Sequence, residues 1–384
     1  MAPHAEEPLP DTGVDLIQHD SSKQYGDWRD EFHKTGVAIV KSVITPERAA
    51  YYRQKQIEWL QSFGLGFDPN DESTWTQAHL PVAFKGGMYF GYGSNHEKYV
   101  WEARMEPKVI ETFENLWDTN ELVVSFDGQN ITLPRQKDLT WSPWPHCDQS
   151  PHRKGMQCVQ GLLNYQPNGP NDGGLIVMRG SSKLFDKFFS ESREQDDHED
   201  KPPESEDFKD LFIFKESDVK WFEGQGCEMT KVNLEPGDLV LWDSRTMHYA
   251  CFPQGERIRH VQYVCMTPRK FAKQEDMDLK AEMFETYQGC KCTDLTQPQY
   301  PRRSTDFYSF LKQHTGLTAI SGKQVCLCAM ARRIRIIARS RSRSRRSRSA
   351  CSNWQEWKLT DESLSEQLEI EVADETIERS FMRT

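Results

Sequence analysis

The feature that most constrains the fold of this chain is a series of short strand-like runs between residues 122 and 268. The runs are "LVVSFDGQNITL", "GMQCVQGLLNYQ", "GGLIVMRG", "VNLEPGDLVLWD" and "RIRHVQYVCM". Turn formers separate them, among them Asp-Gly, the cluster "PNGPNDGG" and Pro-Gly-Asp. Several short strands at this spacing predict a sandwich or barrel and argue against a fold of alternating strands and helices.

The N-terminal part of the chain predicts helices beside this β region. "TGVAIVKSVI" is typical of a strand, and it runs into a helix start at Thr45, Pro46 and Glu47. Threonine is an N-cap residue, proline is tolerated where no amide donor is needed, and an acid suits the positive end of the helix dipole. We expect this helix to stop near Gly64 and a second helix to cover about residues 107–116.

The distribution of charge divides the chain into parts. The 384 residues carry a formal charge of −11, but nine arginines lie within residues 332–348, so the remainder carries −20. We expect a flexible arm over residues 1–27, a folded domain over 28–320 with an acidic loop insert at 190–210, and a low-complexity Arg-Ser tail over 321–384. An acidic body argues against a nucleic-acid partner, and only the tail offers contacts to phosphate.

Cysteine usage and hydropathy indicate where such a protein works. The ten cysteines form no CxxC pair, which is typical of reduced, packed thiols. The N-terminus lacks the basic start and apolar run of a signal peptide, and no apolar stretch is long enough to span a membrane. We therefore expect a cytoplasmic protein without a membrane partner, or a nuclear one if the Arg-Ser tail is genuine.

Two histidines and an aspartate form a candidate metal site. In "SPWPHCDQSP", His146 and Asp148 are two residues apart, so a strand would point both side chains to one face. A third ligand must come from another strand, and His248 and His260 lie in the last strands. We favour His248, because "PGDLVLWDSRTMHYA" places it just after a buried strand. Two histidines and one carboxylate leave one side of an iron(II) ion open for a cosubstrate and dioxygen.

An arginine on the next strand adds a second component to this site. In "GERIRHVQYVCMTP", Arg259 follows the candidate ligand His248, and Arg257 has the same strand parity. A guanidinium aimed into the barrel can form a bidentate pair with a carboxylate. An open iron(II) face together with a buried arginine is what 2-oxoglutarate needs. The residues favour Arg259 and leave Arg257 as the alternative.

These residues match a family. The run "HCDQSP…CVQGLLNYQPNGPNDGGLIVMRGSSKL", followed by "PGDLVLWDSRTMHYA…RHVQYVCMTP", resembles the phytanoyl-CoA dioxygenase family of iron(II)/2-oxoglutarate oxygenases, and fungal members in particular. The resemblance covers about residues 36–271. It implies a mainly β fold with flanking helices, namely a double-stranded β-helix (a cupin-like jelly roll) with the N-terminal helices packed on one sheet. It also implies that His146, Asp148 and His248 are the catalytic iron ligands.

The resemblance also implies how the cosubstrate binds and which reaction follows. Arg259 becomes the 2-oxoglutarate anchor because the pattern R-x-x-x-Y-x-C-x-x-P begins at it, as it does in the family. Gln160 and Asn164, which point inward by alternation on the strand after the His-x-Asp turn, would contact the cosubstrate. The implied reaction is hydroxylation or desaturation of a small metabolite by dioxygen, with release of succinate and carbon dioxide. Halogenation is not expected, because related halogenating enzymes lack the carboxylate that Asp148 supplies.

The Arg-Ser tail leaves two interpretations and a rival function. It is either a segment that directs the protein to the nucleus or to RNA-bound partners, or translated intron at a gene-model boundary. The rival function is a non-catalytic jelly-roll protein that associates with RNA through this tail. Such a protein would tolerate loss of the candidate ligands, and all of them are present.

Overall fold

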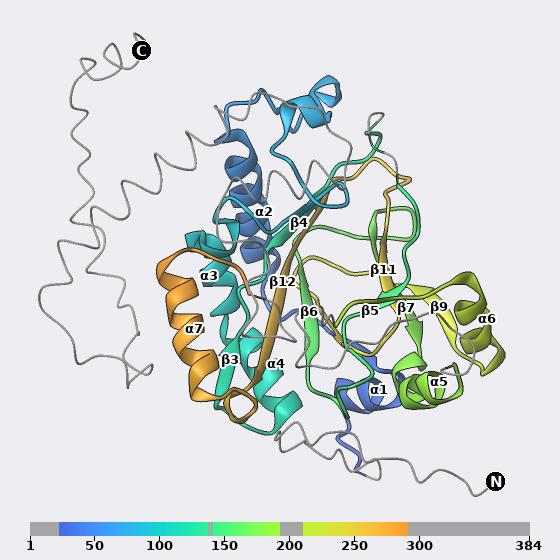
Figure 1. The fold of residues 1–384 in the computed structure, drawn as a ribbon. Coiled ribbons are helices and arrows are strands. Elements are labelled where there is room, and N and C mark those ends of the chain that lie inside the picture. Colours follow the sequence, from blue (N-terminus) through green and yellow to red (C-terminus); the bar gives the residue numbers. More distant parts are fainter. Residues whose placement is uncertain (1–22, 137–138, 140, 193–209, 291–384) are drawn as a thin grey trace, which may run out of the picture. The chain divides into compact units, whose positions relative to one another are not determined.

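Two antiparallel β-sheets organise the described part of the chain, residues 23–136, 139, 141–192 and 210–290 of a computed structural model. All these residues fall within residues 1–329, the first of two units of the chain. The predicted tail lies outside the described residues, as do most of the predicted arm and most of the acidic insert. Figure 1 shows the larger sheet around β12 and β6 and the smaller one around β5 and β11.

The larger sheet has seven strands in the order β1-β10-β6-β12-β4-β2, with β3 paired to β12. Their bounds are β1 Val37–Val40, β2 Met88–Tyr89, β3 Leu122–Val124, β4 Gln129–Thr132, β6 Val159–Asn164, β10 Leu239–Asp243 and β12 Arg259–Pro268. Strands that are neighbours in the sheet are far apart in the sequence. For example, β6 pairs with β10 on one side and with β12 on the other. This crossing of strands is the topology of a jelly roll and not of a simple meander.

The smaller sheet has five strands in the order β8-β5-β11-β7-β9. Their bounds are β5 His146–Cys147, β7 Gly174–Arg179, β8 Phe212–Ile213, β9 Glu228–Lys231 and β11 His248–Cys251. Each pairing in this sheet is antiparallel. The strand-like runs of the sequence therefore form two sheets, and the predicted β architecture is confirmed.

An apolar layer lies between the two sheets. Leu162 of β6, Val240 of β10 and Val261 of β12 pack there against Val177 of β7. Alternation sends the next residues of each strand to the other face, so Val264 belongs to a separate core shared with the helices. Both faces of the larger sheet are thus buried, which explains why β10, Leu239–Asp243, reads as a nearly continuous apolar run.

Helices cover the outer face of the larger sheet. In Figure 1, α2, α3, α4 and α7 lie on one side of β12, and the smaller sheet lies on the other side. The helices are α1 Trp28–Thr35, α2 Pro46–Gln61, α3 Lys98–Arg104, α4 Pro107–Trp117, α5 Phe185–Ser192, α6 Glu216–Gly224 and α7 Gln274–Glu285, with short 3-10 turns at Glu72–Thr74, Gln77–His79, Ser94–His96, Ser181–Leu184 and Arg269–Phe271. None of the helices within the described ranges is long and apolar enough for a membrane span.

The local sequence signals explain where the first helices begin. Thr45 caps α2, because its side chain accepts a hydrogen bond from the backbone amide of Arg48, and Pro46 is the first helical residue. The helix predicted over 107–116 is α4, which extends one residue further. Asp210, the last residue of the predicted acidic insert, forms an ion pair with Arg153, whose Nε lies 2.7 Å from its carboxylate.

Candidate metal centre

The two candidate histidine ligands come from neighbouring strands of the smaller sheet. His146 opens β5 and His248 opens β11, and the two residues are directly paired in the antiparallel register. Their ring centroids are 4.3 Å apart. The sequence predicted that His248 follows a buried strand, and that strand is β10. His248 is also the first residue of a further strand, β11. Its position is therefore set by ladder pairing and not by a loop.

Asp148 completes the cluster from the residue after β5. Its Oδ2 lies 3.3 Å from Nε2 of His248 and 3.7 Å from Nε2 of His146. One possible ligand atom from each of the three residues lies within 4.8 Å of the others. Both imidazoles are buried, whereas the carboxylate side chain is 27% exposed. The predicted triad is therefore assembled, and the aspartate side of it is open to solvent.

The second nitrogen of each imidazole fixes its orientation. Nδ1 of His146 is 3.0 Å from the carbonyl oxygen of Trp144, and Nδ1 of His248 is 2.9 Å from that of Thr246. A carbonyl oxygen only accepts, so each Nδ1 carries a proton and Nε2 is the nitrogen that faces the other ligands. Histidines anchored through one ring nitrogen in this way are how proteins present imidazole to a metal.

The electrostatics of the cluster favour the metal-binding protonation states. Burial, and next the neighbouring His248, lower the pKa of His146 to about 4. Burial alone would raise the pKa of Asp148, but His146, His248 and the Gln160 amide outweigh it and hold that pKa below its usual range. Near neutral pH the site therefore offers a carboxylate beside a neutral imidazole.

Two tryptophans, to which the sequence analysis assigned no role, pack against the ligand rings. The indole of Trp144 stacks on His146 with centroids 3.9 Å apart and planes 7° from parallel. The indole of Trp242 lies 5.3 Å from His248. Trp144 thus holds one ligand twice, through its carbonyl and through its ring. The sequence shows that Trp144 lies two residues before His146, but it does not show that the two rings stack.

The other predicted contacts on β6 differ from each other. Gln160 donates from Nε2 to Oδ2 of Asp148 at 2.9 Å, so it supports a candidate ligand directly. The Asn164 amide instead donates to the carbonyl oxygens of Gln166 and Glu235, which close a turn at the other end of the strand. The structure therefore brings Gln160 to the triad and leaves Asn164 with a bracing role in the fold.

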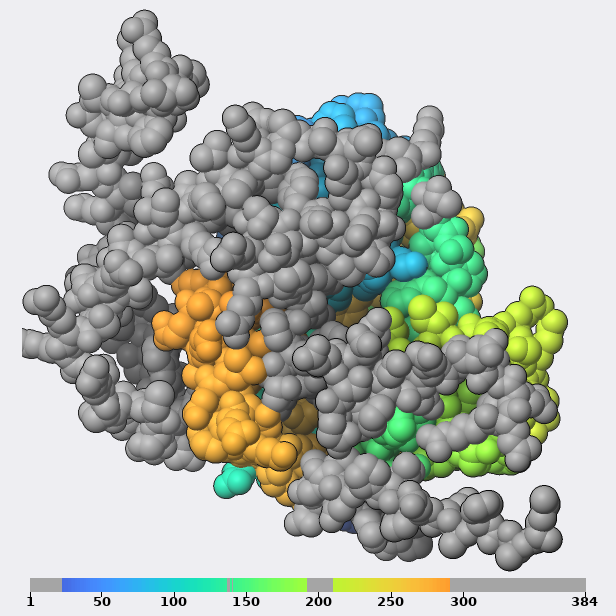
Figure 2. Space-filling view, in the orientation of Figure 1, coloured from blue at the N-terminus to red at the C-terminus, as the bar shows by residue number. Residues whose placement is uncertain are grey.

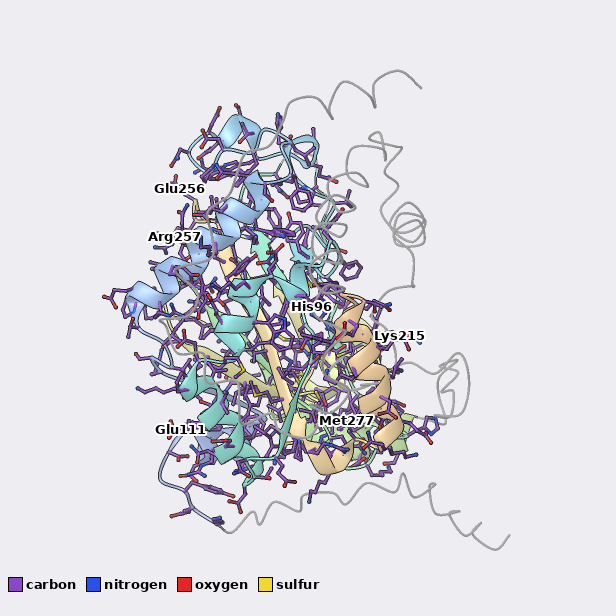
Figure 3. All side chains as sticks on the ribbon, turned by 90° about the vertical axis from the view of Figure 1, so that its left-hand side faces the viewer. His96, Glu111, Lys215, Glu256, Arg257 and Met277 are labelled. Atoms are coloured by element: carbon purple, nitrogen blue, oxygen red, sulfur yellow. The ribbon has the colours of Figure 1, made fainter. Side chains whose placement is uncertain are left out.

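The two candidate arginines differ in what each guanidinium contacts. Arg257 forms an ion pair with Asp172 at 2.8 Å and its side chain is 54% exposed. Figure 3 shows it beside Glu256 at the periphery of the molecule. Arg259 opens β12, is 4% exposed, and its Nε has no hydrogen-bond partner among the described residues. A buried, incompletely paired guanidinium is suited to an incoming carboxylate.

Arg259 has polar neighbours. It shares the inward face of β12 with Val261 and Tyr263, and its positive charge opposes the larger effect of burial, which raises the pKa of Tyr263. The Tyr263 hydroxyl also accepts from Nδ2 of Asn130 at 3.3 Å, and Oδ1 of that asparagine accepts from Thr132 at 2.7 Å. Arg259 thus belongs to a polar group within the otherwise apolar layer between the sheets.

The chain is similar to several known proteins. A family model described as phytanoyl-CoA dioxygenase matches residues 32–261. "Ava biosynthesis cluster protein O" of Aspergillus versicolor is 56% identical over 265 residues, which cover 69% of this chain and 85% of that protein. A putative phytanoyl-CoA dioxygenase of Dictyostelium discoideum is 21% identical over 277 residues, which cover 62% and 74%. Among solved structures, the epimerase SnoN in complex with Fe3+, alpha ketoglutarate and nogalamycin RO has a TM-score of 0.44 and 13% identity, with 63% and 82% covered.

Proposed function

This chain belongs to the phytanoyl-CoA dioxygenase family, and on that premise we propose that it is an iron(II)- and 2-oxoglutarate-dependent dioxygenase that hydroxylates or desaturates a small organic molecule. The observation that carries the proposal is the convergence of His146, Asp148 and His248 on one point. Two histidines and one carboxylate form the facial set that suits iron(II) and leaves positions open for other ligands.

The three residues fit an iron ion in the type and the orientation of their ligand atoms. Nε2 of His146, Nε2 of His248 and a carboxylate oxygen of Asp148 would hold it. Bound there, iron(II) would supply the redox chemistry by which 2-oxoglutarate-dependent enzymes use dioxygen to oxidise a substrate, with release of succinate and carbon dioxide. Gln160 keeps the Asp148 carboxylate in place through a hydrogen bond of 2.9 Å, and the Trp144 ring keeps His146 from rotating.

The environment of Arg259 supports the assignment of 2-oxoglutarate as the cosubstrate. Its buried guanidinium can donate two parallel hydrogen bonds to the distal carboxylate of 2-oxoglutarate. The Tyr263 hydroxyl, which accepts a hydrogen bond from Asn130, adds a polar group on the same face of β12. Arg257 does not suit this role, because Asp172 already pairs with it.

The substrate is proposed to be a biosynthetic intermediate. The support is the name of the Aspergillus versicolor relative, which assigns that protein to a biosynthesis cluster. The substrate would approach the triad from the side of Asp148, since this aspartate is the most exposed of the three residues. No feature of the described residues selects hydroxylation over desaturation.

Incubation with a metabolite extract tests the proposal. Purified protein is loaded with iron(II) and supplied with 2-oxoglutarate, air and an extract of fungal metabolites. We expect succinate to form, together with a product that has gained one oxygen atom or lost two hydrogens. The matched control is His248→Ala, which should form neither. Equal succinate formation by wild type and His248→Ala would refute the assignment.

A further inference from the structure

A lysine is buried on the inner side of the last described helix. Most residues of α7 face solvent, and Figure 2 shows the helix at the surface in orange. Lys280, however, is 6% exposed and points inward with Met283. Its Nζ lies 3.5 Å from the ring centroid of Phe126, in the segment between β3 and β4. A buried ammonium is costly unless it finds a compensating partner.

The partner of this lysine is a cysteine sulfur. Nζ of Lys280 lies 3.1 Å from Sγ of Cys290, which is fully buried. The same sulfur accepts a hydrogen bond of 3.2 Å from the backbone amide of Phe126. The hydroxyl of Ser125 donates to the Cys290 carbonyl oxygen at 3.0 Å and holds the cysteine from the other side. The amine and the sulfur are therefore held in contact by groups around both of them.

The surroundings suit a reaction between these two atoms. Phe126, Met283 and Cys290 form a small apolar cluster with Trp101 and Leu279 packed against it. Dioxygen is small and apolar, so such a cluster admits it more readily than it admits charged oxidants. Burial lowers the pKa of Lys280, which favours the neutral, nucleophilic form of its amine.

We propose that Lys280 and Cys290 are a modification site at which dioxygen forms a covalent N–O–S cross-link, independently of the metal centre. In the balanced step, the thiol loses its hydrogen, the amine loses one hydrogen, and one dioxygen molecule is consumed. One oxygen atom joins sulfur to nitrogen, and the other leaves as water with the two lost hydrogens. Sulfur and nitrogen each give up two electrons, which together reduce both oxygen atoms.

The contact distance favours an oxygen bridge. At 3.1 Å the two atoms need only a small approach to share one oxygen, whereas a direct sulfur–nitrogen bond would require a much larger movement. The link would close the loop from Lys280 to Cys290 and tie the residues after α7 to the helix. A closed loop restricts the unfolded chain, so the linked protein should unfold at a higher temperature.

Peptide mapping of the full-length protein tests this proposal without any variant. Protein purified under reducing, oxygen-free conditions is divided, and one half is exposed to oxygenated buffer. We expect the peptides of Lys280 and Cys290 to appear joined in the exposed half only. Their mass should be the sum of both peptides plus one oxygen and minus two hydrogens, and dithiothreitol should separate them. The exposed half should also show an upward shift of the thermal midpoint that dithiothreitol reverses.

Three variants sharpen the result. Lys280→Arg keeps the charge but removes the primary amine, and Cys290→Ser removes the sulfur, so neither should yield the joined peptides. Cys227→Ser alters another buried cysteine and should yield them as the wild type does. Recovery of Cys290 as a free thiol after exposure, or in a disulfide, would overturn the proposal. A joined peptide that lacks the extra oxygen would overturn the bridge chemistry.

Discussion

His248 lies directly opposite His146 in the β5–β11 pair, and Nε2 of both imidazoles faces one carboxylate oxygen of Asp148, at 3.3 and 3.7 Å. In each histidine, Nδ1 is held by the carbonyl oxygen two residues earlier, that of Trp144 or Thr246. The ladder sets the spacing of the rings, and the carbonyls set their rotation. The site is therefore shaped for a metal before any metal binds.

Replacing each of the two arginines by alanine distinguishes the proposed 2-oxoglutarate anchor from the surface ion pair. Arg259→Ala removes the buried guanidinium, and we expect the concentration of 2-oxoglutarate needed for half-maximal succinate formation to rise at least about 100-fold, since hydrogen bonds between charged groups contribute roughly 1.5–3 kcal/mol each. Iron(II) affinity should be unchanged. Arg257→Ala, which breaks an exposed ion pair with Asp172, is the control and should leave this concentration within about twofold. The reverse ranking would assign the anchor to Arg257.

The indole that stacks on His146 should contribute to metal affinity. Aromatic pairs add roughly 0.5–1.5 kcal/mol beyond their buried area, so Trp144→Ala is expected to weaken cobalt(II) or iron(II) binding about two- to tenfold. Trp141→Ala is the matched control, because that indole stacks on Tyr249 instead of on a ligand. Metal titration followed by visible absorbance measures both. Equal losses in the two variants would show that the stack on His146 has no specific effect.

Two buried histidines outside the site predict acid sensitivity. Burial lowers the pKa of His260 to about 3 and that of His96 to about 4. In the unfolded chain a histidine titrates near pH 6.5, so below that pH the unfolded state binds protons that the native state does not. The stabilisation is complete above about pH 6.5 and is lost as the pH falls toward 4, by up to about 1.4 kcal/mol per pH unit for each histidine.

Denaturant titrations between about pH 8 and pH 4.5, with a chelator present to remove metal effects, measure this dependence. His260→Gln should flatten the decline, since Gln56 can still bond an amide at that position. An unchanged slope in the variant would mean that His260 does not titrate on unfolding in this range.

Deletion of residues 322–384 tests the sequence-based view of the tail. Nine arginines among serines cannot bury apolar area, so we expect the thermal midpoint and succinate formation to stay nearly unchanged. A fall in stability would mean that a C-terminal segment packs on the domain. A loss of nuclear or RNA association with unchanged chemistry would identify the tail as a localisation module.

The β architecture and the His146–Asp148 pair could be predicted because both depend on local patterns, whereas the jelly roll and the full ligand set were implied by the family resemblance. Residues two apart in an extended chain point to the same face, which brings His146 and Asp148 together, and turn formers mark the ends of the strands. The choice between Arg257 and Arg259 was harder, because it depends on Asp172, a loop residue whose place in space has no local signal. The role of Gln160 was only partly predicted, since its inward direction follows from alternation but its bond to Asp148 does not.

Other contacts could not be predicted because they join elements with unrelated patterns. Lys280 lies on a helix with many charged residues, and nothing in that pattern marks it as buried. Its contact with Cys290 depends on how α7 packs beside Phe126. Trp144 likewise lies in an irregular segment before β5, where side-chain direction has no period to follow. Such contacts require tertiary structure.

The most direct test of the central claim is anaerobic titration of the protein with iron(II) in the presence of 2-oxoglutarate. If His146, Asp148 and His248 hold the metal, the wild type should develop the weak visible charge-transfer band of an iron(II)–2-oxoglutarate complex, saturating at one iron per chain. Asp148→Ala and His146→Ala should develop none, while circular dichroism shows that both remain folded. A band of full strength in either folded variant would contradict the account and remove that residue from the site.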